Sequence, residues 1–308
     1  MSSPSLFTRR PVVFALATLC CLLWGSAYPS IKSGYALLSI AADDIPGKLL
    51  FAGWRFLFAG LLLLLFALMT GRSLKLRSAR DAGEVCVLGL FQTSLQYVFF
   101  YLGLAYTTGV KGSIMNATGT FFSVLLAHFI YHNDRVNGRK ALGCLIGFGG
   151  VLVCNFSAEL LDFHFSLAGE GSVVFAAFIL SAASIYGKKL SQRIDSVVLT
   201  GWQLALGGAV LLLIGALMGG TLQAFSFKAL LLMAYMVLLS SVAFALWAQL
   251  LKYNRVGLVA VFNFLIPVSG AVLSAVFLGE QILEFKYLVA LVLVCGGIWL
   301  VTKEGKPA

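Results

Sequence analysis

The residues of this 308-residue chain that could do chemistry are mostly uncharged and lie inside long apolar runs. Four polar side chains follow one another at positions i, i+3, i+7 and i+10, so they share one face of a helix: Ser113, Asn116, Thr120 and Ser123. An uncharged polar group that faces lipid has no partner and is costly, so this face predicts a water-filled cavity between helices. Neutral amides offer both donors and acceptors, and could hold a zwitterion without preferring either charge.

Other candidates for the cavity wall are polar or aromatic side chains that sit within apolar runs. They are Trp24, Tyr28, Gln92, Gln96, Ser181, Ser184, Ser240, Trp247 and Asn263. For each hydroxyl, a hydrogen bond between packed helices is the competing interpretation. Tyr28 and Trp247 lie nearer the ends of their runs, where a belt at the membrane interface is the alternative. With Asn116 and Thr120, these residues form the predicted substrate-binding set.

Three further residues are candidates for a gate. Arg55 is the one ionisable side chain well inside an apolar run, where an arginine costs about 2.5–3.5 kcal/mol at a helix centre and less if it reaches the interface. Two interpretations stay open: a structural arginine that reaches the interface, or an anchor for a carboxylate at an outer gate. Pro29 and Pro267 remove backbone hydrogen bonds and predict kinks that could act as gating joints.

Acidic residues and cysteines exclude several kinds of chemistry. All twelve carboxylates fall in predicted loops or at the ends of apolar runs, so the chain lacks the buried acids of an aspartyl protease or a carboxylate-driven proton antiporter. His128 and Asp134 have an unsuitable spacing and no partner nucleophile for acyl transfer. The six cysteines lie in apolar stretches without metal-type spacing to histidine, and we interpret them as small core residues. We expect no enzyme activity, no cofactor and no metal site.

The composition excludes a soluble globule. Hydrophobic residues make up 60% of the chain and charged residues 11%, against about 45–50% and 25% in soluble domains. The formal charge of +10 comes from small basic groups between apolar runs, without a basic domain or arm that would suggest nucleic acid. The expected partners are therefore a lipid bilayer and a small-molecule substrate.

The distance between successive charges predicts the membrane spans. A bilayer core about 30 Å thick needs roughly 20 apolar residues per helix, and ten segments of this chain approach that length. The first is interpreted as a retained helix in preference to a cleaved signal peptide. If the amino terminus is inside, sixteen of the 22 basic residues fall in inner segments, which predicts that both termini are cytoplasmic. We expect an all-α, multi-pass protein of the inner (plasma) membrane.

An internal repeat divides these ten helices into five and five. Residues 113–150 align with residues 260–297 at an offset of 147, and Asn116 then meets Asn263. Because five is odd, the second half is inverted relative to the first. Inverted halves are typical of transporters whose substrate site lies at the repeat interface near mid-depth. The predicted repeats are residues 11–155 and 168–303.

Several motifs carry a resemblance to a known family. They are Leu23 to Tyr28 in the first helix, Trp54-Arg55-Phe56, Trp247 to Leu251, and Leu278-Gly279-Glu280. These resemble the EamA repeats of the drug/metabolite transporter superfamily, and the resemblance covers nearly the whole chain, with a departure at His132-Asn133-Asp134. It implies a ten-helix inner-membrane carrier, commonly an exporter of amino acids or related small metabolites, that alternates between inward and outward openings.

We therefore predict a secondary transporter that exports small metabolites, above all amino acids or related zwitterions, by alternating access through a central cavity. Without a buried carboxylate, facilitated diffusion or weak coupling is expected. Two alternatives stay open: an exporter of hydrophobic cations or drugs, held by aromatic walls, and a membrane scaffold or sensor without a translocated substrate. Glycine pairs such as Gly143/Gly147 permit close helix packing but decide neither for a monomer nor for a homodimer.

Overall fold

The computed structural model describes residues 6–156, 165–222, 226–278 and 285–303. Within these ranges every regular element is a helix, which confirms the expected all-α architecture. The elements in chain order are η1 (Leu6–Thr8), α1 (Arg10–Leu37), α2 (Ile45–Met69), α3 (Ala79–Gly89), η2 (Leu90–Leu95), α4 (Gln96–Tyr106), α5 (Gly109–Ala117), α6 (Gly119–Ile130), α7 (Gly138–Cys154), η4 (Leu167–Gly171), α8 (Ser172–Leu190), α9 (Ser196–Leu217), α10 (Phe227–Tyr253), α11 (Val256–Ala260), η5 (Val261–Phe264), α12 (Leu265–Leu278) and α13 (Phe285–Thr302).

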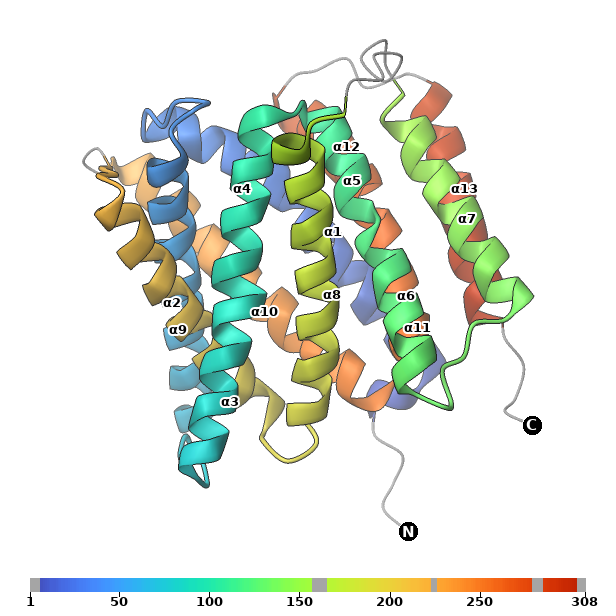
Figure 1. The fold of residues 1–308 in the computed structure, drawn as a ribbon, viewed down its shortest axis with the longest axis horizontal. Helices are drawn as coiled ribbons and strands as arrows, with labels where there is room; N and C mark the ends of the chain where they lie inside the picture. The colour runs from blue at the N-terminus through green and yellow to red at the C-terminus, as the bar shows by residue number, and fades with distance from the viewer. Residues whose placement is uncertain (1–5, 157–164, 223–225, 279–284, 304–308) are drawn as a thin grey trace.

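Nine helical segments in the described ranges are long and apolar enough to cross a membrane. Several are composite: α3, η2 and α4 continue one another along one segment, as do α11, η5 and α12. The remaining expected crossing corresponds to α7, which has 17 residues and packs lengthwise against α13 (Figure 1). This tenth crossing stays a prediction.

The two ends of the described bundle are distinguished by where the chain starts and finishes. α1 begins and α13 ends on the same side, the lower side in Figure 1, and we call this side the terminal face. The connections at residues 70–78, 131–137, 191–195 and 254–255 also lie there. Which side of a membrane the terminal face meets stays a prediction.

Two helix pairs at opposite ends of the molecule are packed backbone to backbone (Figure 1). In the pair α2 and α9, a methyl group built on Gly208 would lie 2.3 Å from the backbone nitrogen of Leu57. In the pair α7 and α13, a methyl group on Gly297 would lie 2.5 Å from the carbonyl oxygen of Gly143. Glycine is needed at such positions because a side chain would separate the helices. The pair Gly143/Gly147 therefore serves packing within this chain.

The cysteines divide between the interior and the helix surface. Four are buried, in agreement with their interpretation as core residues: Cys20, Cys21, Cys144 and Cys154. For Cys86 and Cys295 that interpretation is wrong, because both are exposed. A thiol is apolar enough to face hydrocarbon as well as protein, so its place in an apolar run does not distinguish the two.

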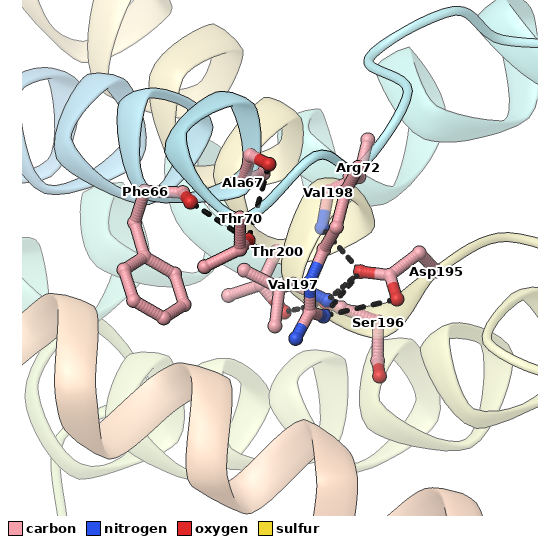
Figure 2. A network of polar contacts seen from close by, with 9 residues as sticks. All are labelled: Phe66, Ala67, Thr70, Arg72, Asp195, Ser196, Val197, Val198 and Thr200. Atoms are coloured by element: carbon pink, nitrogen blue, oxygen red, sulfur yellow. Dashed lines mark hydrogen bonds and ion pairs between the residues drawn. The ribbon is translucent and has the colours of Figure 1, made fainter.

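A polar contact at the terminal face joins the end of α2 to the start of α9 (Figure 2). Arg72 Nη1 donates to both carboxylate oxygens of Asp195 at 3.0 Å. Asp195 also caps α9, since its Oδ1 accepts from the backbone N–H groups of Val197 at 2.9 Å and Val198 at 3.2 Å. One side chain thus holds the ends of two close-packed helices.

The two partners in this contact are expected to differ in their effect on stability. Arg72→Ala should lower the free energy of unfolding by about 1 kcal/mol or less, because the two side chains are 34% and 42% exposed and water screens the pair. Asp195→Ala should cost about 1–2 kcal/mol, since it also removes the helix cap. Unfolding of the purified variants measures both. Equal losses would contradict the assignment of the larger share to the cap.

Candidate functional site

A central cavity of about 290 Å³ lies between the helices of the two halves. The expected wall comes from the first, third, fourth, sixth, eighth and ninth helices, and all six contribute. α2 and α9, the second and seventh helices, contribute as well. In the described part of the chain, no lining residue comes from α7 or α13. The close-packed pair α7 and α13 therefore stands apart from the cavity, whereas the other close-packed pair borders it.

The polar face of the fourth helix borders the cavity with all four of its members: Ser113, Asn116, Thr120 and Ser123. The helix is interrupted there, since α5 ends and α6 begins on either side of Thr118, whose backbone N–H donates to Met115 three residues back at 3.1 Å. The Thr120 hydroxyl is buried without a hydrogen-bond partner among the described residues. Asn116 thus lies in the last turn of α5, beside a backbone irregularity.

The ninth helix is interrupted at the matching position. Its segment η5 is a 3-10 turn between α11 and α12, and Asn263 lies within it on the cavity wall. The side-chain oxygen of Asn263 is buried and has no partner within the described ranges. Pro267 also borders the cavity, in the first turn of α12, where a missing N–H costs little. Paired interruptions in two related halves are typical of transporter substrate sites.

The third helix contains a wide turn beside the cavity. η2 is a π-helical segment that holds Gln92, and Gln96 begins α4 directly after it. Both amides border the cavity. Gln96 is 4% exposed, and its carbonyl oxygen has no partner in the described structure. π-turns inside α-helices frequently mark functional sites.

The predicted serines have different surroundings. Ser181 and Ser184 border the cavity from α8, and Ser181 also donates to the Gly119 carbonyl at 2.8 Å, so it takes the helix-packing role as well. Ser240 does not line the cavity and is fully buried. α10 contacts α2 at this level, since the adjacent Ser241 donates to the Ala59 carbonyl at 3.1 Å. Helix packing therefore covers Ser240, although its spacing from the lining residue Phe244 suggested the same face.

The aromatic candidates form one wall. The Trp24 ring meets Phe244 at a centroid distance of 5.4 Å and Trp247 at 5.1 Å, both edge to face. Tyr28 borders the same cavity from α1. All three predicted aromatic residues, Trp24, Tyr28 and Trp247, therefore lie on the cavity and not only at the edge of the bundle.

The gate candidates are distributed differently from the expectation. α2 begins at Ile45, so Arg55 lies ten residues into the helix, or about 15 Å along its axis, and borders the cavity. It lies deeper than a residue at an outer gate. Pro29 is buried within α1, which continues through it, and is not part of the cavity wall.

Several lining residues were missed from the sequence: Lys48, Tyr97, Tyr101, Lys188, Thr200 and Gln203. Gln203 could have been found, because it is an amide inside an apolar helix, the same signal that marked Gln92. It hydrogen-bonds Thr93 of the π-turn, so it connects the second half to the irregular segment of the first. Lys48 was counted as the end of a span, although it belongs to the first turn of α2.

A buried ion pair lies near the terminal end of the cavity. Lys140 Nζ donates to Asp134 Oδ1 at 2.8 Å, and the backbone N–H of Gly257 donates to Asp134 Oδ2 at 2.8 Å. This contact connects the loop after α6 to the start of α11 in the other half. Burial, together with the Asp134 carboxylate, raises the pKa of Tyr131. His128 Nδ1 accepts from the backbone N–H of Val136 at 3.0 Å, as expected for a satisfied histidine.

Acidic groups are absent from the described cavity wall. Five carboxylates lie outside the described residues: Glu159, Asp162, Glu280, Glu284 and Glu304. Within the described residues, no group of three His, Cys, Asp or Glu side chains is placed to hold a metal ion. The described wall therefore presents amides, hydroxyls, aromatic rings and cations.

Apolar crossing helices, two related halves and a central polar cavity define a membrane transporter. The EamA-like transporter family matches residues 12–156 and 167–303, and the chain belongs to this family. Two matches to one family confirm the expected family and the presence of two repeats. This membership, like the names of the relatives, indicates a transporter and not an enzyme.

Relatives from distant organisms match almost the whole chain. The uncharacterized transporter YvbV of Bacillus subtilis is 29% identical over 97% of this chain and 93% of its own length. An uncharacterized transporter of Archaeoglobus fulgidus is 28% identical over 94% of this chain and 96% of its own length. A protein of Salmonella typhimurium named as a probable amino-acid metabolite efflux pump is 25% identical over 92% of this chain and 93% of its own length.

A solved crystal structure shows the same fold. It matches with a TM-score of 0.75 at 20% identity and covers 93% of this chain and 96% of its own. At this identity the likeness concerns the arrangement of helices alone.

Proposed function

We propose that this protein exports small metabolites, such as amino acids or related zwitterions, by alternating access through the central cavity. The observation that carries the proposal is the set of neutral amides from both halves on the cavity wall: Gln92, Gln96, Asn116, Gln203 and Asn263. Amides can serve an ammonium and a carboxylate at once. The name of the Salmonella relative, a probable amino-acid metabolite efflux pump, supports the same substrate class.

The proposed setting is the inner (plasma) membrane, crossed ten times, with the terminal face in the cytoplasm. Basic residues at that face support this orientation, because short cytoplasmic segments retain lysine and arginine: Arg72, Lys75, Arg77, Arg135, Arg193 and Arg255. The repeats are proposed to extend over residues 11–155 and 168–303. Interruptions in the fourth and ninth helices supply matching joints for the two openings.

Export of hydrophobic cations is the less favoured alternative. The rings of Trp24, Phe244 and Trp247 could hold such a cation. However, the described wall carries Arg55 and no carboxylate, so a cation would meet repulsion without a counter-charge. A scaffold or sensor without a translocated substrate would not need these amides.

The function is tested by comparing extracellular metabolites of cells with and without overproduction of the protein. Gln96→Leu and Asn116→Leu should each reduce the exported fraction by at least about tenfold, which is the size of one lost hydrogen bond to a charged group. Asn155→Leu is the matched control, because this amide lies at the end of α7 outside the cavity wall and should leave export unchanged. Export retained in both cavity variants at equal protein levels would remove these amides from the site.

A further inference from the structure

Arg55 is buried at the cavity and has no acidic partner among the described residues. The side chain is 2% exposed and lies on the cavity wall, so it does not extend to the surface of the bundle as an interfacial arginine would. Its Nη2 donates to the Tyr97 hydroxyl at 3.4 Å, a long contact. Its Nε and Nη1 are buried, and neither has a hydrogen-bond partner in the described ranges. An arginine in a protein is always charged, so this charge is left uncompensated by the surrounding side chains.

The surroundings of Arg55 are aromatic. The guanidinium carbon lies 4.2 Å from the ring centre of Phe56 and 5.9 Å from that of Tyr97. The phenol groups of Tyr35 and Tyr101 are also close enough to interact electrostatically with the charge of Arg55. The rings orient the planar guanidinium, and the hydroxyls can donate hydrogen bonds to an anion held by it.

The other two cations on the cavity wall have acidic neighbours in the protein. Lys48 lies within electrostatic range of Asp43 and Asp44. Lys188 lies within range of Asp134, near the terminal end of the cavity. Of the cations described on this wall, Arg55 is therefore the one left without a carboxylate nearby.

We propose that Arg55 binds a carboxylate of the substrate, and that the cavity for this reason prefers substrates of net negative charge over neutral or cationic ones. The proposal rests on the proposed transport function and narrows its substrate class from zwitterions to acidic amino acids and similar organic anions. The guanidinium fork matches the two oxygens of a carboxylate, and pairing in a cavity removed from bulk water is stronger than pairing at a surface. An acidic amino acid and its amide carry the same ammonium, but the acid has a second carboxylate, so the positive charge of Arg55 attracts the acid more strongly.

Selectivity between matched substrates tests this charge preference. Proteoliposomes with the membrane potential clamped to zero are loaded with equal concentrations of glutamate, glutamine, aspartate, asparagine and lysine, and the initial efflux of each is measured by mass spectrometry. We expect glutamate and aspartate to leave at least about tenfold faster than their amides, with lysine slowest. In Arg55→Gln the two acids should slow by about tenfold or more relative to their amides, so that the acid-to-amide ratio falls close to one. Arg55→Lys keeps the charge without the fork and should be intermediate.

Control outcomes separate this proposal from the proposed function. Lys228→Gln removes a positive charge from an exposed site at the start of α10, on the side of the bundle opposite the terminal face. This control should leave the acid-to-amide ratio unchanged. Efflux with no acid preference, or a preference that persists in Arg55→Gln, would overturn the role of Arg55 while leaving transport intact. No efflux of any probe above that of empty liposomes would count against both proposals.

Stability without substrate provides a second readout. If Arg55 serves the substrate and not the fold, removing its unpaired charge should leave the unfolding temperature of Arg55→Gln unchanged or higher. A fall of more than about 5 °C would assign Arg55 a structural role and contradict the proposal.

Discussion

Replacing Lys140 with methionine is expected to lower the free energy of unfolding by about 3–5 kcal/mol, because it removes the ammonium that is hydrogen-bonded to the buried carboxylate of Asp134. The two side chains are 2% and 1% exposed, and the distance between Nζ and Oδ1 is 2.8 Å. Of the donors described around this carboxylate, the backbone N–H of Gly257 would remain. Denaturation of the purified protein in detergent micelles measures the loss.

A double variant separates this loss of charge pairing from loss of packing. Asp134→Asn combined with Lys140→Met removes both charges and keeps an acceptor for Gly257, so more than half of the lost stability should return. Arg139→Met is the control, since this neighbouring side chain is exposed and should change stability by about 0.5 kcal/mol or less. Simple addition of the two single losses in the double variant would contradict the ion-pair explanation.

Adding one methyl group at Gly297 is expected to cost about 3 kcal/mol of stability, at the upper end of the usual cost of overpacking. The new carbon would lie 2.5 Å from the carbonyl oxygen of Gly143 and 2.7 Å from the backbone nitrogen of Gly147. Both obstacles are backbone atoms, so α7 and α13 would have to separate. Thermal unfolding of Gly297→Ala and of the unaltered protein gives the difference.

The adjacent residue provides a matched control for this prediction. A methyl group on Gly296 would meet no described atom within 4 Å, so Gly296→Ala should cost no stability, because alanine favours a helix over glycine. The same change one position along the chain thus has a large or a negligible effect, depending on which helix face carries it. Equal losses at both positions would contradict the contact with α7 as the cause, because alanine favours a helix over glycine and propensity alone would produce no loss.

Much of the helix arrangement could be predicted from the spacing of charges and polar groups. The charge-to-charge distances located the nine described apolar segments, because a charge inside the bilayer is costly. The 3.6-residue period placed Ser113, Asn116, Thr120 and Ser123 on one face, and that face borders the cavity. The offset of 147 paired Asn116 with Asn263, and both lie at helix interruptions.

Depth and neighbours could not be derived in the same way. Lys48 was used to mark the end of a span, but its long side chain is buried in the first turn of α2, so Arg55 lies deeper than the distance between charges suggested. Periodicity gives the face of a helix and not the element that covers it, which is why Ser240 was wrongly placed on the cavity wall. The π-turn at η2 has no signal in the residue types, since it depends on one extra residue per turn.

That wide turn also limits how far the two halves can exchange roles. The residues of α10 that correspond to η2 by the offset of 147 are 237–242, and they belong to an uninterrupted α-helix. The opposite opening of a carrier with inverted repeats is often built by giving each half the conformation of the other. Here that procedure would place Gln92 at the wrong rotation about its helix axis, because α10 has no π-turn. Under the proposed alternating access, the two openings are therefore expected to differ in the third and eighth helices, and the second opening has to be determined directly.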